Sequence, residues 1–246
     1  MIKKIIFKKI KFLNIKENEF TKIIKKRGLF LFPSGPNLAD LNKNFQYHKS
    51  LKHADVNFFD SGYFVLLLRY FKNINVKKFS GYLFTKLFLN YLNKSKKRIT
   101  ILSIDANKKQ SISNKKLFLI KGINQKFLTN YVAPIYKSNS IIDIKLLQII
   151  KKKRPKYIII HLGGGVQEIL GLYLKENLNY KPTIICTGAA ISFFTGNQAP
   201  LKYIFDKNYL GWLIRIIYNP RVFLPRYLKA FKLFYLILNN KVIIKY

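Results

Sequence analysis

Short, uninterrupted apolar runs alternate along this chain with longer segments of helical pattern, and this alternation limits the fold more than any other feature. Strands that are apolar throughout are typical of a parallel sheet with both faces covered. The sequence therefore predicts an α/β fold: a Rossmann-like, mostly parallel sheet with helices on both faces. We expect strands at residues 5–13, 29–32, 54–59, 98–104, 117–120, 157–162 and 183–187. We expect helices at residues 17–26, 38–50, 63–71, 82–92, 142–152 and 167–178.

The composition changes near residue 207, after which the chain becomes aromatic and basic. We expect residues 1–206 to form the α/β core and residues 207–246 a helical C-terminal appendage. Such a segment could rest on a membrane surface or close over the core, or it could be an ordinary terminal helix packed on the sheet. The predicted apolar face of this helix consists of Tyr227, Phe231, Phe234 and Leu238, opposite Arg226, Lys229 and Lys232.

The charge of the chain calls for an anionic partner. In 246 residues, 46 Lys and Arg stand against 10 Asp and Glu, a net charge of +36, while 49% apolar residues argue for a folded core. Nucleic acid, an anionic membrane surface and phosphorylated substrates all fit this charge, and so does a coding bias towards lysine.

The pattern of apolar residues and cysteines indicates the compartment. No apolar stretch reaches the length of a spanning helix and no signal-peptide pattern is visible, so we expect a cytoplasmic protein. A single cysteine, Cys186, excludes an internal disulfide framework and a cysteine-based zinc cluster.

With only ten carboxylates, the candidates for a general acid or base are few. Asp60 follows the apolar run at 54–59 and precedes Ser61, which places it at the carboxyl end of a parallel strand, where open α/β sheets bind ligands. A general base would belong there. An N-cap of the following helix is an equally good interpretation.

Two glycine turns are candidate phosphate sites. A strand runs into Gly163, Gly164 and Gly165 and then a helix, so backbone amides and the positive helix end could cradle a phosphate. A plain tight turn is the alternative, because the run matches neither GxGxxG nor GxxxxGK[ST]. A second turn, at Gly188 and Ala189, follows the next strand, and the pair makes a nucleotide site plausible.

Metal and nucleophile motifs are absent from the sequence. There is no Asp-x-Asp and no GxSxG, and His48, His53 and His161 lack ligand spacing. His161 could point into the site from its strand end or serve the core. We expect no metal and no cofactor, so that arginine, lysine and backbone amides would meet any phosphate charge.

An ordered string of motifs resembles the WecG/TagA/CpsF glycosyltransferases, glycosyltransferase family 26. Six segments look like the family's Gly-x-Pro-x-Gln-Glu, Gly-Ala-x-x-Asp-x-x-x-Gly, Ala-Pro, Glu-Trp-x-x-Arg, Glu-Pro-x-Arg and Arg-Tyr-Leu. Asn37, Asp60 and Lys78 also fall where the family has Asn, Asp and Arg. The six segments are residues 163–168, 188–196, 199–200, 211–215, 219–221 and 226–228.

Six positions depart from these motifs, as in a divergent branch of the family. Gly35 replaces the usual Thr, Gly165 the Pro and Val166 a basic residue. Ser192 replaces an acidic residue, and Gly211 and Asn219 each replace a Glu.

The resemblance implies an inverting transfer of a sugar, N-acetylmannosamine-type or a related hexose, from a UDP-sugar to an undecaprenyl-diphosphate-linked acceptor. It also implies a peripheral place on the inner face of the cell membrane, and it leaves homo-oligomerisation open. Asp60 would be the catalytic base. The implied substrate-binding residues are Asn37, Lys78, Gly163, Gly164, Gly165, Gln167, Glu168, Gly188, Ala189, Arg215, Arg221 and Arg226.

Two alternatives belong to other classes. One is a non-catalytic basic protein that binds nucleic acid or an anionic membrane. The basic residues that fall in the motifs are explained by the family resemblance, so they do not indicate specific nucleic-acid binding. The other is a protein that has the fold of this family but has lost its catalytic activity.

Overall fold

The computed structural model describes residues 3–95, 98–136, 140–197 and 203–245. Its strands are β1 (Lys4–Phe7), β2 (Ile10–Leu13), β3 (Gly28–Leu31), β4 (Val56–Phe58), β5 (Ile101–Asp105), β6 (Leu128–Val132), β7 (Tyr157–His161), β8 (Thr183–Cys186) and β9 (Val242–Lys245). Its α-helices are α1 (Phe20–Ile24), α2 (Gly35–Ala39), α3 (Phe45–His53), α4 (Gly62–Lys72), α5 (Gly81–Lys94), α6 (Lys108–Ile120), α7 (Ile144–Lys153), α8 (Val166–Asn177), α9 (Ser192–Thr195), α10 (Tyr203–Lys207), α11 (Gly211–Tyr218), α12 (Pro220–Ala230) and α13 (Lys232–Leu238). Short 3-10 turns are η1 (Glu17–Glu19), η2 (Gln125–Phe127) and η3 (Gly188–Ile191).

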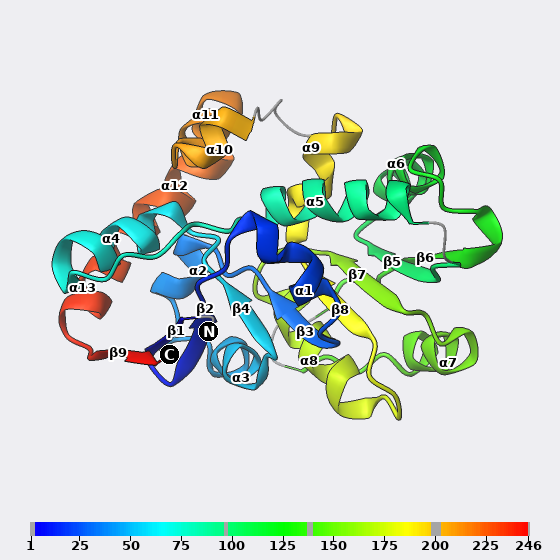
Figure 1. The fold of residues 1–246 in the computed structure, drawn as a ribbon, viewed down its shortest axis with the longest axis horizontal. Coiled ribbons are helices and arrows are strands. Elements are labelled where there is room, and N and C mark those ends of the chain that lie inside the picture. The colour runs from blue at the N-terminus through cyan, green and yellow to red at the C-terminus, as the bar shows by residue number, and fades with distance from the viewer. Residues whose placement is uncertain (1–2, 96–97, 137–139, 198–202, 246) are drawn as a thin grey trace.

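The described strands form one sheet in the order β6-β5-β7-β8-β3-β4-β2-β1-β9 (Figure 1). Every pairing from β6 to β2 is parallel, and β1 pairs antiparallel with both β2 and β9. The predicted mostly parallel α/β sheet is therefore confirmed. Because the parallel strands run the same way, their following loops meet at one edge of the sheet, where such folds bind ligands.

Two apolar layers cover the two faces of the sheet. One contains residues of α2, α3, α4, α7, α8 and α13, and the other contains residues of α1, α5 and α6. In β7, Ile158 and Ile160 belong to the first layer, and Tyr157 and Ile159 to the second. Burial on both faces is the reason that the strands lack a polar alternation.

The prediction of one strand at residues 5–13 is wrong, because β1 and β2 form a hairpin there. Phe7 pairs with Ile10, which leaves Lys8 and Lys9 as a two-residue turn with φ of 48° and 63°. Positive φ at both turn residues is typical of tight hairpins and is usually signalled by Asn-Gly or Asp-Gly. Two lysines carry no such signal.

The predicted strand at residues 117–120 is also wrong, because these residues are the last turn of α6. The buried residues of α6 are Asn114, Leu117 and Phe118, which have the i, i+3, i+4 spacing of one helix face. A four-residue apolar run does not distinguish a strand from a helix. The edge strand is β6, whose sequence Leu-Thr-Asn-Tyr-Val has little apolar pattern.

The predicted helix at residues 38–50 is two helices, α2 and α3, joined by a turn. Pro36 lies in the first turn of α2, as its fixed φ favours. Asn44 caps α3, because its side chain accepts a hydrogen bond from the N–H of Tyr47. The second start signal therefore lies inside the segment that sequence periodicity assigns to one helix.

After residue 207 the chain forms α11, α12 and α13 and then returns to the sheet as β9, beside β1 (Figure 1). Both α12 and α13 contact α2. The buried residues here are Ala230, Leu233 and Ile237 instead of the predicted face, and Phe231 is 61% exposed. The helix breaks at Phe231, between α12 and α13, which changes the face that points inward. The described helices include none that is long and apolar enough to cross a bilayer.

Candidate active site

A cavity of about 760 Å³ lies at the carboxyl edge of the parallel strands. Its walls come from the loops after β3, β4, β5, β7 and β8 and from α11 and α12. The sheet therefore supplies one side of the cavity, and the chain after residue 207 supplies another.

Most of the predicted site residues line this cavity, although they are spread from position 37 to position 226. The lining residues among them are Asn37, Asp60, Lys78, Gly163, Gly164, Gln167, Glu168, Gly188, Ala189, Arg215 and Arg226. Gly165 and Arg221 are not part of the lining: Gly165 caps α8, and Arg221 is exposed on α12.

Asp60 lies just beyond β4, where its Oδ1 accepts a hydrogen bond from the N–H of Gly81 at 2.8 Å. It does not cap α4, because Ser61 holds that position and its Oγ accepts from the N–H of Phe64. Burial raises the pKa of Asp60 to about 6. The hydrogen bond from Gly81 and the charge of Lys78 act in the opposite direction and lower the pKa, but burial outweighs them. A carboxyl that titrates near neutral pH suits a general base.

Glu168 lies in the first turn of α8 and is only 1% exposed. Its Oε2 accepts a hydrogen bond from the N–H of Gly165 at 2.6 Å, and its Oε1 accepts from Nε2 of Gln167 at 3.0 Å. Burial raises the pKa of Glu168 to about 7, and the nearby Asp60 acts in the same direction. Glu168 therefore stabilises the first glycine turn from within.

Two side-chain amides lie directly against the glycine turns. A Cβ atom at Gly164 would collide with the amide of Asn37. One at Gly188, whose φ is 60°, would lie 3.3 Å from Nε2 of Gln167. Glycine at these positions thus lets Asn37 and Gln167 approach the backbone, and the two amides can donate to a ligand beside the main-chain N–H groups.

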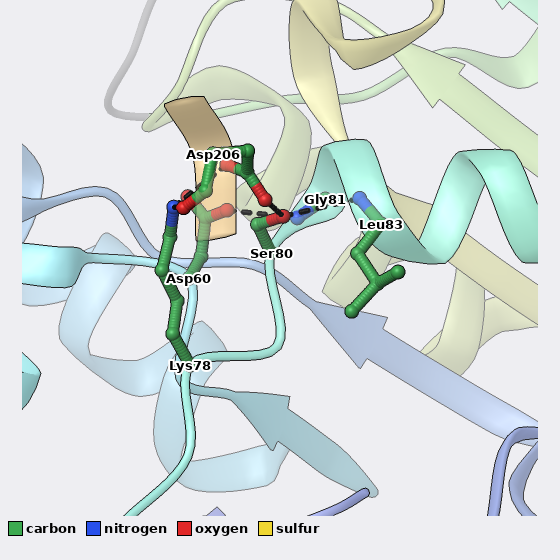
Figure 2. A network of polar contacts seen from close by, with 6 residues as sticks. All are labelled: Asp60, Lys78, Ser80, Gly81, Leu83 and Asp206. Atoms are coloured by element: carbon green, nitrogen blue, oxygen red, sulfur yellow. Dashed lines mark hydrogen bonds and ion pairs between the residues drawn. The ribbon is translucent and has the colours of Figure 1, made fainter. Parts of the chain in front are cut away.

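Lys78 forms an ion pair with Asp206 of α10, with 2.6 Å between Nζ and Oδ1 (Figure 2). The same ammonium donates to the backbone oxygen of Asp206 at 2.7 Å, and the hydroxyl of Ser80 donates to Oδ2 at 2.5 Å. The Lys78 and Asp206 side chains are 11% and 10% exposed. Two of the three ammonium donors are therefore occupied by a residue that is 128 positions away in sequence.

Arg215 and Arg226 add positive charge to the cavity from α11 and α12. The guanidinium of Arg215 lies 5.0 Å from the centroid of Phe193, and that of Arg226 lies 5.9 Å from Phe223. Aromatic contacts of this kind orient a guanidinium without using its N–H donors. Both guanidinium groups can therefore donate paired hydrogen bonds to a phosphate.

His161 closes β7 and borders the cavity, but it is only 3% exposed. Its burial lowers the pKa of the imidazole, so the ring is neutral at neutral pH. Both ring nitrogens are shielded from solvent, and the ring interacts with the backbone of Gly188. The shielding favours the structural interpretation of His161 over a role in ligand binding.

Several cavity residues escaped prediction from the sequence. Asp206 has the clearest signal in hindsight, because it is the only acidic residue after Glu176. Trp212 and Tyr227 lie within the motif segments at 211–215 and 226–228, whereas the other aromatic members had no distinguishing signal in a chain with this many aromatic residues. The missed residues include Tyr63, Tyr82, Lys109, Gln110, Asp206, Tyr209, Trp212, Tyr227 and Phe231.

A carboxylate of raised pKa, two glycine turns and several cations meet at the carboxyl edge of a parallel sheet. Together they define an α/β protein whose cavity suits a phosphorylated ligand. Within the described residues, no group of three or more His, Cys, Asp and Glu side chains could hold a metal ion.

The family model of the WecG/TagA/CpsF glycosyl transferases matches residues 5–245, nearly the whole chain. The chain therefore belongs to this family, as the motifs predict. Comparison with curated proteins gives no significant match.

Proposed function

We propose that the protein is an inverting, metal-independent glycosyltransferase of surface polysaccharide or teichoic acid-type synthesis. It transfers an N-acetylmannosamine-type or related hexose from a UDP-sugar to a polyprenyl-diphosphate-linked saccharide. Membership of the family supports glycosyl transfer. The observation that carries the finer proposal is Asp60, a carboxyl with a raised pKa that faces a cavity rich in positive charge.

Asp60 acts as the general base in a single displacement. The acceptor hydroxyl oxygen attacks the anomeric carbon, and its proton passes to the Asp60 carboxylate. The bond between the anomeric carbon and the diphosphate oxygen breaks as the new glycosidic bond forms, and the electron pair leaves with UDP. Attack from the side opposite the leaving group inverts the anomeric configuration.

The residues around the glycine turns hold the donor and the acceptor. The turns at Gly163–Gly165 and Gly188–Ala189 bind the nucleotide through backbone N–H groups. Asn37, Gln167 and Glu168 position the reacting sugars, either directly or by bracing the turns. Alignment of this kind converts binding energy into a lower barrier.

The charge of the departing diphosphate is met by cationic side chains. Lys78, Arg215 and Arg226 line the cavity and make up the proposed set, whereas Arg221 lies outside the lining. Charge-assisted hydrogen bonds to phosphate strengthen as negative charge develops on the leaving oxygen, which lowers the barrier without a metal ion.

A lipid-linked acceptor requires the protein to work at a membrane surface. The helices α11, α12 and α13 combine exposed apolar side chains with exposed basic ones, which suits an anionic interface. We therefore propose a peripheral location on the inner face of the cell membrane, with the C-terminal helices in contact with lipid.

A transfer assay tests this function. The purified protein is incubated with anionic vesicles, a panel of UDP-sugars and a short-chain polyprenyl-diphosphate saccharide, and UDP release and glycosylated lipid are measured. We expect the variant Asp60→Asn to bind UDP but to transfer about a hundredfold more slowly or worse, since it has no base.

The matched control is Asp40→Asn, which neutralises a carboxylate outside the cavity and should leave the rate unchanged. Transfer that survives in Asp60→Asn would overturn the assignment of the base. If the wild-type protein neither binds UDP nor consumes any donor, the proposed function itself is wrong.

A further inference from the structure

Asp206 is a buried carboxylate that connects α10, where the C-terminal segment (residues 203–245) begins, to the edge of the active site. It comes from α10, yet its side chain contacts Lys78 and Ser80, which precede α5 (Figure 2). Removing a carboxylate from water is costly unless it is paired and hydrogen-bonded. Both Oδ atoms of Asp206 have such partners, at 2.6 Å and 2.5 Å.

The same turn that holds Asp206 also holds Asp60. Ser80 caps α5, because its Oγ accepts from the N–H of Leu83 at 3.0 Å, and the same hydroxyl donates to Asp206. The next residue, Gly81, donates its N–H to Asp60. Two carboxylates thus bind adjacent groups of one helix N-terminus, and Figure 2 shows both side chains at this turn.

The two carboxylates also interact through their charges. Asp206 raises the pKa of Asp60, whereas Lys78, which is held by Asp206, lowers it. The titratable groups that interact with Asp60 through their charges are Lys78, Asp206, Arg215, Glu168 and the hydroxyl of Tyr47.

We propose that Asp206 is a positioning residue of the active site, which fixes Lys78 and the Ser80–Gly81 turn and thereby sets the orientation of Asp60 and the charges around it. This inference rests on the proposed function, since it assigns Asp60 as the base. The same contacts hold α10 against the start of α5.

The first test is the pH dependence of transfer by Asp206→Asn, which keeps the shape of the side chain and removes its charge. In this variant the backbone oxygen of residue 206 still accepts from Lys78, so the ammonium stays near Asp60 while the anion is lost. The pKa of Asp60 then falls, and the acidic limb of the kcat/KM profile should move to lower pH. We expect a shift of about half a pH unit or more, with kcat reduced about tenfold because Lys78 and the turn are less well held.

The control is Glu176→Gln, which removes one negative charge from the exposed pair with Lys49, outside the cavity. It should reproduce the wild-type profile. If Asp206→Asn leaves the acidic limb where it is in the wild type, even with a lower rate, Asp206 does not tune the base and the proposal is overturned. A rate above that of the wild type would also overturn it, because Asp206 would then restrain the enzyme.

The second test needs no activity and so separates this inference from the proposed function. Trp212, the single tryptophan, follows α10 closely and is 44% exposed in the cavity wall. If Asp206 holds the segment, Asp206→Asn should increase quenching of Trp212 fluorescence by acrylamide, whereas Glu176→Gln should not. Unchanged quenching would contradict the positioning role, whether or not a donor sugar has been found.

Discussion

Asp60 and Glu168 are neighbouring carboxyls whose surroundings give them different tasks. Asp60 is partly accessible from the cavity, and one backbone N–H holds it. Glu168 is shielded and uses both oxygens within its own turn. Because proton transfer requires contact with the substrate, Asp60 is the better candidate for the base and Glu168 for a supporting role.

The raised pKa of Asp60 predicts the pH dependence of transfer. Burial raises this pKa to about 6, and the base must be deprotonated to accept the proton of the acceptor. Below about pH 6, kcat/KM should therefore fall by about tenfold per pH unit. Steady-state rates between pH 4.5 and 8 measure this limb, and a flat profile down to pH 4.5 would contradict the prediction.

Glu168 should make the stability of the fold depend on pH. Its pKa rises from 4.5 to about 7 on folding, so the native state binds more protons than the unfolded state between these values. The free energy of unfolding therefore falls as the pH rises from about 4.5 to about 7. The variant Glu168→Gln should be more stable than the wild type at pH 8, by about 3 kcal/mol, and similar to it near pH 4.5.

Urea unfolding at both pH values measures this difference. The amide oxygen of the glutamine can still accept from Gly165, so the turn is preserved. A Glu168→Gln protein that is less stable than the wild type at pH 8 would show that the charged form is the favoured one.

Single residues differ in how far the sequence reveals them. Asp60 is recognisable because it directly follows an apolar strand, and this position alone puts it at the ligand-binding edge. Asp206 is not, because its partners Lys78 and Ser80 lie more than 120 positions away in sequence. Arg221 shows the converse: it lies in a segment that resembles Glu-Pro-x-Arg, yet it occupies the variable position, position 222 is valine, and Arg221 is outside the cavity lining.

Among the elements, the central parallel strands were predictable and the edge strands were not. Strands β3, β7 and β8 are buried on both faces, so their sequences are continuous apolar runs. The edge strand β6 is mostly half-buried and the edge strand β9 is largely exposed, so burial constrains their composition less. These two strands form because β6 pairs with β5 and β9 pairs with β1, and a local sequence pattern does not reveal such pairing.

Gly171 allows α8 to pack closely on the sheet, which leads to a prediction for this helix. A Cβ atom there would lie 2.7 Å from Cδ1 of Leu29 and 2.9 Å from Sγ of Cys186. We expect Gly171→Ala to destabilise the protein by about 1–3 kcal/mol through overpacking, which exceeds the gain in helix propensity of about 1 kcal/mol.

Thermal unfolding measures this effect. Gly163→Ala is the matched control, because an added Cβ there meets no atom within 4 Å and should leave the melting temperature unchanged. If Gly171→Ala were as stable as the control, the close contact of α8 with β3 and β8 would not limit packing.

At the scale of the whole molecule, apolar residues remain exposed along α11 and α12. Ile217, Leu224 and Leu228 are 73%, 44% and 56% exposed, and none of them lines the cavity. Exposed basic residues, among them Arg221 and Lys229, lie on α12 with them. An apolar surface beside positive charge suits an anionic bilayer.

We therefore predict that the protein binds vesicles containing anionic lipid, and that added salt weakens this binding. The triple variant Ile217→Ser, Leu224→Ser, Leu228→Ser should bind about tenfold more weakly in vesicle sedimentation, because less apolar surface enters the interface.

The control replaces an equal number of exposed isoleucines elsewhere: Ile112→Ser, Ile120→Ser and Ile142→Ser, which are 66%, 73% and 73% exposed. Their loss should not affect vesicle binding. Equal weakening by both triple variants would show that the C-terminal helices are not the membrane contact.

The sequence by itself determined the class of fold, the edge of the sheet that carries the site, and the family. These properties depend on local burial patterns and on motifs that are contiguous along the chain. Tertiary structure alone decided the two-residue hairpin turn, the edge strands, the buried face of the C-terminal helices and the contact of Asp206 with Lys78. Each of these depends on which distant segments become neighbours, and the free energy of such contacts arises only when the chain has folded.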